Sequence, residues 1–253
     1  MPRVKFLGTQ SYKKKGVSEI NNMESQINYG ILPFIIFCLI WMSLNTPYFC
    51  NMFNVLQQGQ LSFFQQALHW DYRLMIWINT GLSSSWLDFI TLFMRESIFH
   101  VPLYVFIIIF VFTHAGKKGW TWLLIGVLLI SVSDFVSSHF IKDYFNRLRP
   151  CRDPFMAHQI RFLAKYCGAN GSFTSSHAVN HFAFATYVFG TLKKYSPYFF
   201  LLFLWAGFIS FSQVYVGVHY PSDVIVGGVL GCLFGWTAVR IFRRPFSSLQ
   251  FTV

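Results

Sequence analysis

The sequence predicts an all-helical integral membrane protein with about six transmembrane helices. Of its 253 residues, 54% are hydrophobic and only 11% are charged, whereas a soluble domain carries charge on about a quarter of its positions. This composition excludes disorder, collagen and coiled coil, and it argues against an ordinary cytosolic enzyme. Several apolar runs approach the roughly 20 residues that a membrane-spanning helix needs. The runs lie at 31–47, 98–114, 119–141, 177–192, 197–217 and 221–243.

The segment between the first two runs has a different composition. Residues 60–96 mix tryptophan and phenylalanine with charged residues such as Asp71 and Arg95, which is typical of a helix that lies in the membrane interface. Residues 1–30 are polar, and the run after them lacks a small-residue cleavage site, so a removed signal peptide is not expected. The expected parts are a cytoplasmic N-terminus (1–30), a first span with an interfacial segment (31–97), a core (98–245) and a tail (246–253).

The basic residues predict the topology. The net charge of +11 is compatible with nucleic acid, an anionic membrane or an anionic substrate. Each basic cluster borders an apolar run, so a nucleic-acid partner is not expected, and the positive-inside rule places four clusters in the cytoplasm. These clusters are the N-terminal lysines at 13–15, Lys117–Lys118, Lys193–Lys194 and the arginines at 240–244. Residues 142–176 and 218–221 then share the exterior side, where further basic residues gather.

The first polar cluster follows one stripe of the run at 119–141. Ser131, Asp134, Ser138 and Lys142 are three or four positions apart, so they share a helix face. An ionisable residue within a span usually faces the bundle interior or a wet cavity. The stripe therefore brings Lys142 to the exterior end of its helix, close to Arg149 in the following loop. The alternative is that both cations only snorkel to the interface.

The second and third polar clusters also fall on the exterior side. Small hydroxyl residues before His177 leave backbone N–H groups of a helix start free to bind an anion, although N-capping alone would also explain them. His219 and Asp223 are four residues apart, so the carboxylate can hold one ring nitrogen and leave the other free as a nucleophile or base. This pair could instead only close a turn. Convergence of three such clusters on one face favours a catalytic site.

Cysteine spacing gives no sign of a metal site, because neither CxxC pairs nor an HExxH pattern occurs. Cys151 and Cys167 both lie in the predicted exterior loop, where oxidation is permitted. We expect a disulfide between them, with two free thiols as the alternative.

Together, the three clusters resemble the signatures of the type 2 phosphatidic acid phosphatase (PAP2) superfamily. Lys142, six residues and Arg149-Pro150 match the first signature. The stretch from Thr174 to His177 is similar to the second, Pro-Ser-Gly-His. Ser212-Gln213, five residues, His219, three residues and Asp223 are similar to the third, in which arginine stands at the position of Gln213. The resemblance covers about residues 100–243.

The resemblance implies a role for each matched residue. His219 would attack phosphorus and become a phosphohistidine, Asp223 would orient His219, and His177 would protonate the leaving oxygen and later activate water. It implies no metal or other cofactor. The groups expected to bind phosphate are Lys142, Arg149, Ser175 and the backbone N–H of Ser176.

Two departures from the family pattern affect these roles. Thr174 and Ser176 replace proline and glycine of the second signature, and because serine is small we expect the anion-binding loop to persist. Gln213 could donate a hydrogen bond to phosphate but carries no charge. Arg147 and Arg152 could replace the missing cation, and of these we expect Arg147.

The resemblance therefore implies a phosphatase that acts on a phosphorylated membrane lipid. We expect a multi-pass protein of the bacterial inner membrane whose site faces the periplasm and cleaves a phosphomonoester or diphosphate headgroup. The cysteine after Arg149-Pro150, and Ser-Ser-His in place of Ser-Gly-His, are similar to bacterial members of the family that act on lipid A or undecaprenyl diphosphate. The alternatives are a lipid phosphotransferase with the same residues and a catalytically silent lipid-binding or transport protein.

Overall fold

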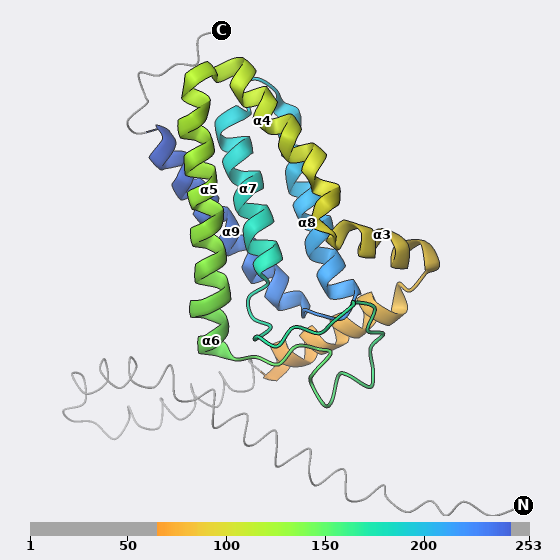
Figure 1. Cartoon of the computed structure of the whole chain (residues 1–253). Coiled ribbons are helices and arrows are strands. Elements are labelled where there is room, and N and C mark those ends of the chain that lie inside the picture. The colour runs from red at the N-terminus through yellow and green to blue at the C-terminus, as the bar shows by residue number, and fades with distance from the viewer. Residues whose placement is uncertain (1–64, 244–253) are drawn as a thin grey trace, which may run out of the picture. The chain divides into compact units, whose positions relative to one another are not determined.

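The computed structural model describes residues 65–243, and all secondary-structure elements of this part are helices, without strands (Figure 1). The predicted first span at 31–47 and both predicted terminal segments lie outside these residues.

A helical hairpin opens the bundle. Helix α4 (Val101–Ala115) and helix α5 (Gly119–Phe135) are joined by a tight turn, in which Gly116 has a φ of 52° that favours glycine. Both helices are apolar on nearly every side, as expected for helices solvated by lipid. A π-helix (Val136–Ile141) and the short α6 (Lys142–Phe145) continue α5 to the start of a long loop.

Three further helices complete the bundle. These are α7 (Ser176–Leu192), α8 (Leu201–Tyr215) and α9 (Pro221–Arg243). Helix α9 packs closely on α7 through glycines that recur every four residues. A Cβ atom added at Gly235 would lie 2.5 Å from the carbonyl oxygen of Ala183, and one at Gly227 would lie 2.9 Å from that of Ser175. Small residues thus allow the backbones to approach, as in many membrane helix pairs.

The described helices confirm a membrane protein. Three stretches are long and apolar enough to cross a bilayer, namely Ser97–Phe145, Pro197–Tyr215 and Pro221–Arg243. The first stretch contains two of the predicted runs, which the turn at Gly116 folds into a hairpin. Helix α7 corresponds to the run at 177–192 and has 17 residues. The total of six spans stays a prediction, because it also requires the run at 31–47.

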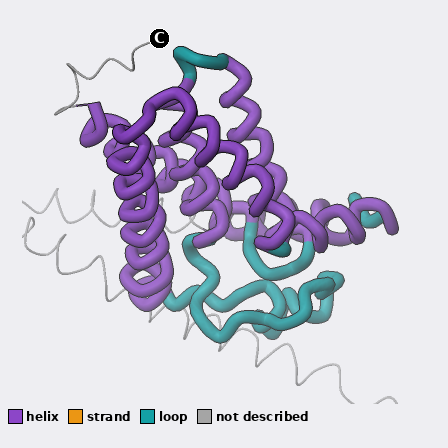
Figure 2. The backbone as a smooth tube through the Cα atoms, turned by 45° about the horizontal axis from the view of Figure 1, so that its top comes forward, coloured by secondary structure: helices purple, strands orange, loops and turns teal. Residues whose placement is uncertain are grey.

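Two helices run across the bundle rather than along it (Figure 1). One covers residues 65–76 and the other is α3 (Ser85–Arg95), which Ser84 caps by accepting a hydrogen bond from the Leu87 N–H. A π-helix (Trp77–Gly81) lies between them. This crosswise course is compatible with the predicted interfacial position. Figure 2 shows the loop of residues 146–175 gathered at the same end of the bundle.

Candidate active site

The loop that follows α6 closes one end of the bundle. Asn146 ends α6 in the left-handed conformation, with a φ of 40°, which asparagine tolerates better than most residues. Cys151 and Cys167 form a disulfide with a Cα–Cα distance of 6.2 Å, so the predicted pairing is confirmed. The loop thereby becomes a closed, covalently constrained segment beside the signature residues.

Lys142 joins the first signature to the second. Its buried ammonium group donates a hydrogen bond of 2.8 Å to Ser176 Oγ, and the Ser137 and Ser138 hydroxyls lie 3.1 and 2.9 Å from the same oxygen. The serine that replaces the family's glycine therefore holds the lysine. Asp134, from the predicted stripe, accepts a hydrogen bond of 2.9 Å from Asn180, so this part of the stripe lies beside α7.

The second signature forms the start of α7. Ser175 is the N-cap, and its side chain lies 3.5 Å from the Ala178 N–H. The Ser175 N–H donates to the backbone carbonyl of Asp223 at 3.1 Å, which ties this helix start to the start of α9. His177 lies in the first turn with an exposed ring, nearly parallel to the ring of His181 at a centroid distance of 6.1 Å. The imidazole of His177 is therefore accessible to a substrate.

His219 lies in the turn between α8 and α9, where Pro221 begins the new helix. Its Nε2 lies 3.3 Å from Arg149 Nη1, and its Nδ1 lies 3.5 Å from Asp223 Oδ2. A guanidinium can only donate hydrogen bonds, so Nε2 accepts and the ring proton belongs on Nδ1, facing the carboxylate. The distance to Asp223 is longer than a well-formed hydrogen bond.

Electrostatics keeps this imidazole neutral. Burial lowers the pKa of His219 to about 4, although Asp223 acts in the opposite direction. Burial also lowers the pKa of Arg149, and the charges of Arg95 and Arg152 lower it further against the effect of Asp223. The site therefore holds a neutral nitrogen base beside cations that an incoming anion would stabilise.

Asp223 is buried and fully engaged. Its carboxylate accepts hydrogen bonds from the Ser172 hydroxyl, from the Tyr220 N–H at 2.9 Å and from Arg147 Nη1 at 2.8 Å. Such partners are what a buried carboxylate requires. They hold its position and leave it directed at the His219 ring.

Arg147 is held between two carboxylates, which differs from our expectation that it binds phosphate. Its Nη2 donates to Asp71 Oδ2 at 2.6 Å, and its guanidinium lies 3.9 Å from the centre of the Tyr220 ring. Burial acts to lower the pKa of Arg147, but Asp223 and Asp71 outweigh it and raise the pKa. Both Nη atoms of the guanidinium already donate to carboxylates. Arg147 therefore positions Asp223 instead of binding phosphate. Asp71 belongs to no signature and is, from sequence alone, one of several charged residues in the predicted interfacial segment.

Comparison with known proteins identifies the family of this chain. A family model described as the PAP2 superfamily matches residues 119–247, about half of the chain. The chain belongs to the PAP2 superfamily. It is accordingly a membrane-bound hydrolase that acts on phosphoric esters.

Individual PAP2 relatives extend the match. The chain is 27% identical over 183 residues to a lipid A 4'-phosphatase of Bacteroides thetaiotaomicron, which covers 71% of this chain and 80% of the relative. A lipid A 4'-phosphatase of Porphyromonas gingivalis is 28% identical over 123 residues, covering 47% of this chain and about half (51%) of the relative. The fold is that of a crystallised PAP2-type phosphatidylglycerolphosphate phosphatase of Bacillus subtilis, with a TM-score of 0.55 at 20% identity over 79% of this chain and 98% of that one.

Gln213 has an unexpected partner in this PAP2 chain. Its buried amide oxygen accepts a hydrogen bond of 3.3 Å from Arg95 Nε, at the end of α3. Arg152, the other candidate replacement, instead donates to the loop carbonyls of Cys167 and Ala169 at 3.4 Å each. No motif marks Arg95, which from sequence alone is only one of several charges in the predicted interfacial segment.

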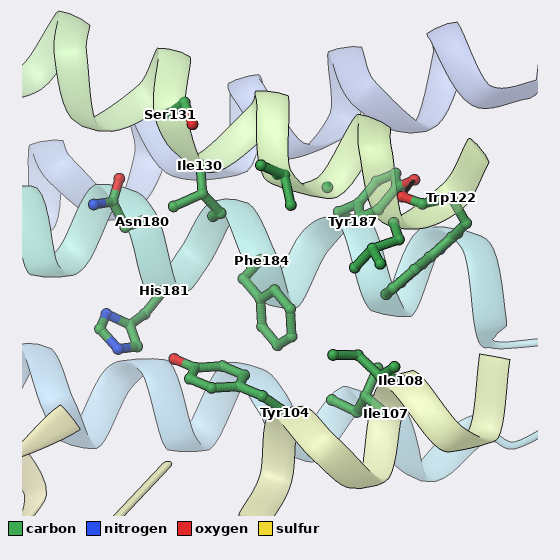
Figure 3. Close-up of a pocket in the computed structure, with 13 residues that line it drawn as sticks. Tyr104, Ile107, Ile108, Trp122, Ile130, Ser131, Asn180, His181, Phe184 and Tyr187 are labelled. Carbon is green, nitrogen blue, oxygen red and sulfur yellow. Dashed lines mark hydrogen bonds between the residues drawn. The ribbon is translucent and has the colours of Figure 1, made fainter. Parts of the chain in front are cut away.

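An apolar cavity of about 410 Å³ opens beside the PAP2 site, between α4, α5 and α7 (Figure 3). Isoleucine and aromatic side chains form most of its wall. Ser131, Asn180 and His181 contribute polar groups, and His181 lies one helical turn after His177. The cavity therefore begins one helical turn from His177 and continues along the apolar helices.

Proposed function

We propose that this PAP2 protein removes phosphate from the headgroup of a membrane lipid through a phosphohistidine intermediate. The observation that carries the proposal is the 3.3 Å contact between Arg149 Nη1 and His219 Nε2, because it leaves a lone pair on Nε2 beside a cation. A phosphoryl group attached to Nε2 would lie against the guanidinium.

In the first step the Nε2 lone pair attacks phosphorus, an N–P bond forms and the P–O bond to the lipid breaks. Protonated His177 gives its proton to the departing oxygen. The His219 ring becomes positively charged, and Asp223 stabilises that charge from the Nδ1 side. Lys142 and Arg149 neutralise the negative charge on the phosphoryl oxygens.

In the second step water attacks the phosphohistidine. His177, now neutral, takes a proton from the water while the N–P bond breaks, and inorganic phosphate leaves. His219 returns to its neutral form and His177 to its protonated form. The Ser175 side chain and the backbone N–H of Ser176 lie at the positive end of α7, where they would contribute further contacts to the anion.

The substrate we propose is lipid A or undecaprenyl diphosphate. The relatives named as lipid A 4'-phosphatases support a phosphorylated lipid of this kind. The apolar cavity supports it as well, since it could hold an acyl or isoprenoid chain while the phosphate reaches His219. The disulfide supports a periplasmic site in the bacterial inner membrane, because disulfides persist in oxidising compartments.

The test is phosphate release by the purified protein in detergent, measured on lipid A, undecaprenyl diphosphate, phosphatidylglycerophosphate and phosphatidate. We expect release from at least one lipid, no release by His219→Ala, and an acid-labile phosphoenzyme in rapidly quenched wild-type samples. Transfer of the phosphate to a second lipid instead of water would identify a phosphotransferase. Lipid binding without any release or transfer would overturn the proposal and indicate a silent lipid-binding protein.

A further inference from the structure

We propose that Arg95 supplies the phosphate-binding cation that the third signature of this chain lacks, and that Gln213 positions it. The inference rests on the proposed function and adds a residue from outside the matched region of 119–247. Arg95 is the last residue of α3, which precedes that region by 24 positions in the sequence.

The first support is the state of the Gln213 amide. Gln213 is 1% exposed, and its Oε1 accepts the hydrogen bond from Arg95 Nε. Its Nε2 is buried and has no hydrogen-bond partner within residues 65–243. A buried donor without a partner is costly, and a phosphate oxygen would satisfy it. The Gln213 side chain is therefore suited to link the two groups, with Oε1 accepting from Arg95 and Nε2 donating to a phosphate oxygen.

The second support is the charge of Arg95. Burial lowers its pKa, and none of the ion pairs formed by the described residues includes it. The neighbouring Glu96 is paired with Lys165 at 2.6 Å. A half-buried cation without a paired carboxylate is stabilised by binding an anion.

The third support is the location of that charge. The guanidinium of Arg95 lies close enough to His177 and to Arg149 for their charges to interact. These are the proposed general acid and a proposed phosphate ligand, so Arg95 lies near the place where the phosphate would bind. Arg147, which we had expected in this role, is committed to Asp71 and Asp223.

The fold explains how a helix outside the signatures reaches the site. Asp88 of α3 accepts hydrogen bonds from Arg161 in the loop at 2.5 Å and from the Tyr215 hydroxyl at 2.6 Å. Asn79, just before α3, donates to the backbone carbonyls of the same two residues at 2.8 and 2.7 Å. These contacts dock α3 against the end of α8, and Gln213 lies in the last turn of α8.

The experiment compares four purified variants with the wild type. Arg95→Ala should lower kcat/KM for the best lipid substrate by roughly 10- to 100-fold, the effect of losing one charged hydrogen bond. Arg95→Lys should retain part of the activity. The double variant Arg95→Ala with Gln213→Arg, which restores the family's third signature, should recover most of the loss. Arg73→Ala is the matched control, because Arg73 is an exposed arginine of the adjacent crosswise helix whose guanidinium lies over Trp70.

Affinity for inorganic vanadate, measured by its effect on thermal unfolding, gives a second readout that does not require turnover. It should weaken in Arg95→Ala and recover in the double variant. Unchanged activity and vanadate affinity in Arg95→Ala would overturn the inference while leaving the proposed function intact. Loss without recovery in the double variant would show that Arg95 only supports the docking of α3. Absence of phosphate release by the wild type would refute the proposed function, and vanadate affinity would then still decide whether Arg95 binds the anion.

Discussion

Arg149 Nη1 lies 3.3 Å from His219 Nε2, and this pair joins the first signature of the PAP2 site to the third. The two residues are 70 positions apart in the chain. Because the guanidinium can only donate, the contact also defines the tautomer of the imidazole. From sequence alone Arg149 is one of several loop cations, whereas the structure gives it a specific partner in the His219 ring.

The carboxylate behind His219 should be essential. In Asp223, Oδ2 accepts from Ser172 and Tyr220 and Oδ1 accepts from Arg147. In Asp223→Asn an amide nitrogen replaces one of these two oxygens, and the Nδ1 proton of His219 loses its negatively charged partner. We expect kcat to fall by about 10²- to 10⁴-fold, as in other sites where a carboxylate orients a histidine. Rates of phosphate release by purified protein test this, with circular dichroism as the control for folding. A variant with wild-type kcat would rule out the orienting role.

The ionisation of His219 should occur well below its ordinary range. With a pKa near 4 in the folded protein and near 6.5 in the unfolded chain, its nucleophilic nitrogen stays free of protons down to about pH 4. Between these two values the unfolded chain binds the proton first, so the free energy of unfolding should decrease as the pH falls through this window. NMR titration of labelled histidine, with His219→Ala to assign the signal, measures the midpoint. A midpoint near 6.5 would contradict the burial argument.

Asp71 should support catalysis without contacting the substrate. It accepts from Arg147 Nη2 at 2.6 Å and from the Ser222 N–H at 2.8 Å, so Asp71→Asn weakens the contacts that hold Arg147 against Asp223. We expect the free energy of unfolding to fall by about 2–4 kcal/mol and kcat to fall more than KM rises. Chemical unfolding in detergent and steady-state kinetics measure both effects. The exposed Asp143→Asn serves as the control, and equal behaviour of the two variants would refute the role of Asp71.

The disulfide should stabilise the loop that carries Arg147 and Arg149. It joins residues 16 positions apart, and closing a loop of this length contributes about 3 kcal/mol. Replacing both cysteines by serine, or adding a reductant, should lower the midpoint of thermal unfolding and reduce activity. Reductant should have no effect on the serine variant. A wild-type midpoint that is insensitive to reductant would contradict this prediction.

The cavity should select for the lipid chain. Ser131→Phe places a large ring in the cavity wall, so KM for a long-chain lipid phosphate should rise while hydrolysis of a short, water-soluble phosphate ester stays unchanged. Val132→Phe is the matched control, because Val132 is 51% exposed and does not line the cavity. Equal effects of both substitutions on the lipid substrate would exclude the cavity as the binding site of the chain.

Local patterns in the sequence predicted much of this protein. Apolar runs marked helices α4, α5, α7, α8 and α9, and the four-residue spacing of His219 and Asp223 predicted that the carboxylate lies beside the imidazole. The three signatures also predicted Lys142, Arg149 and His177 at one end of the bundle. The paired loop cysteines predicted the disulfide.

Only the tertiary structure shows that Arg147 positions Asp223 and that Arg95 reaches Gln213. The Arg147–Asp71 and Arg95–Gln213 hydrogen bonds join residues 76 and 118 positions apart, between a signature region and crosswise helices that carry no motif. The packing of the helices determines which acceptor groups come within about 3 Å of a long, flexible arginine side chain, and so determines its partner. Spacing along the chain does not encode that choice, because it depends on contacts that form only once the crosswise helices dock against the bundle.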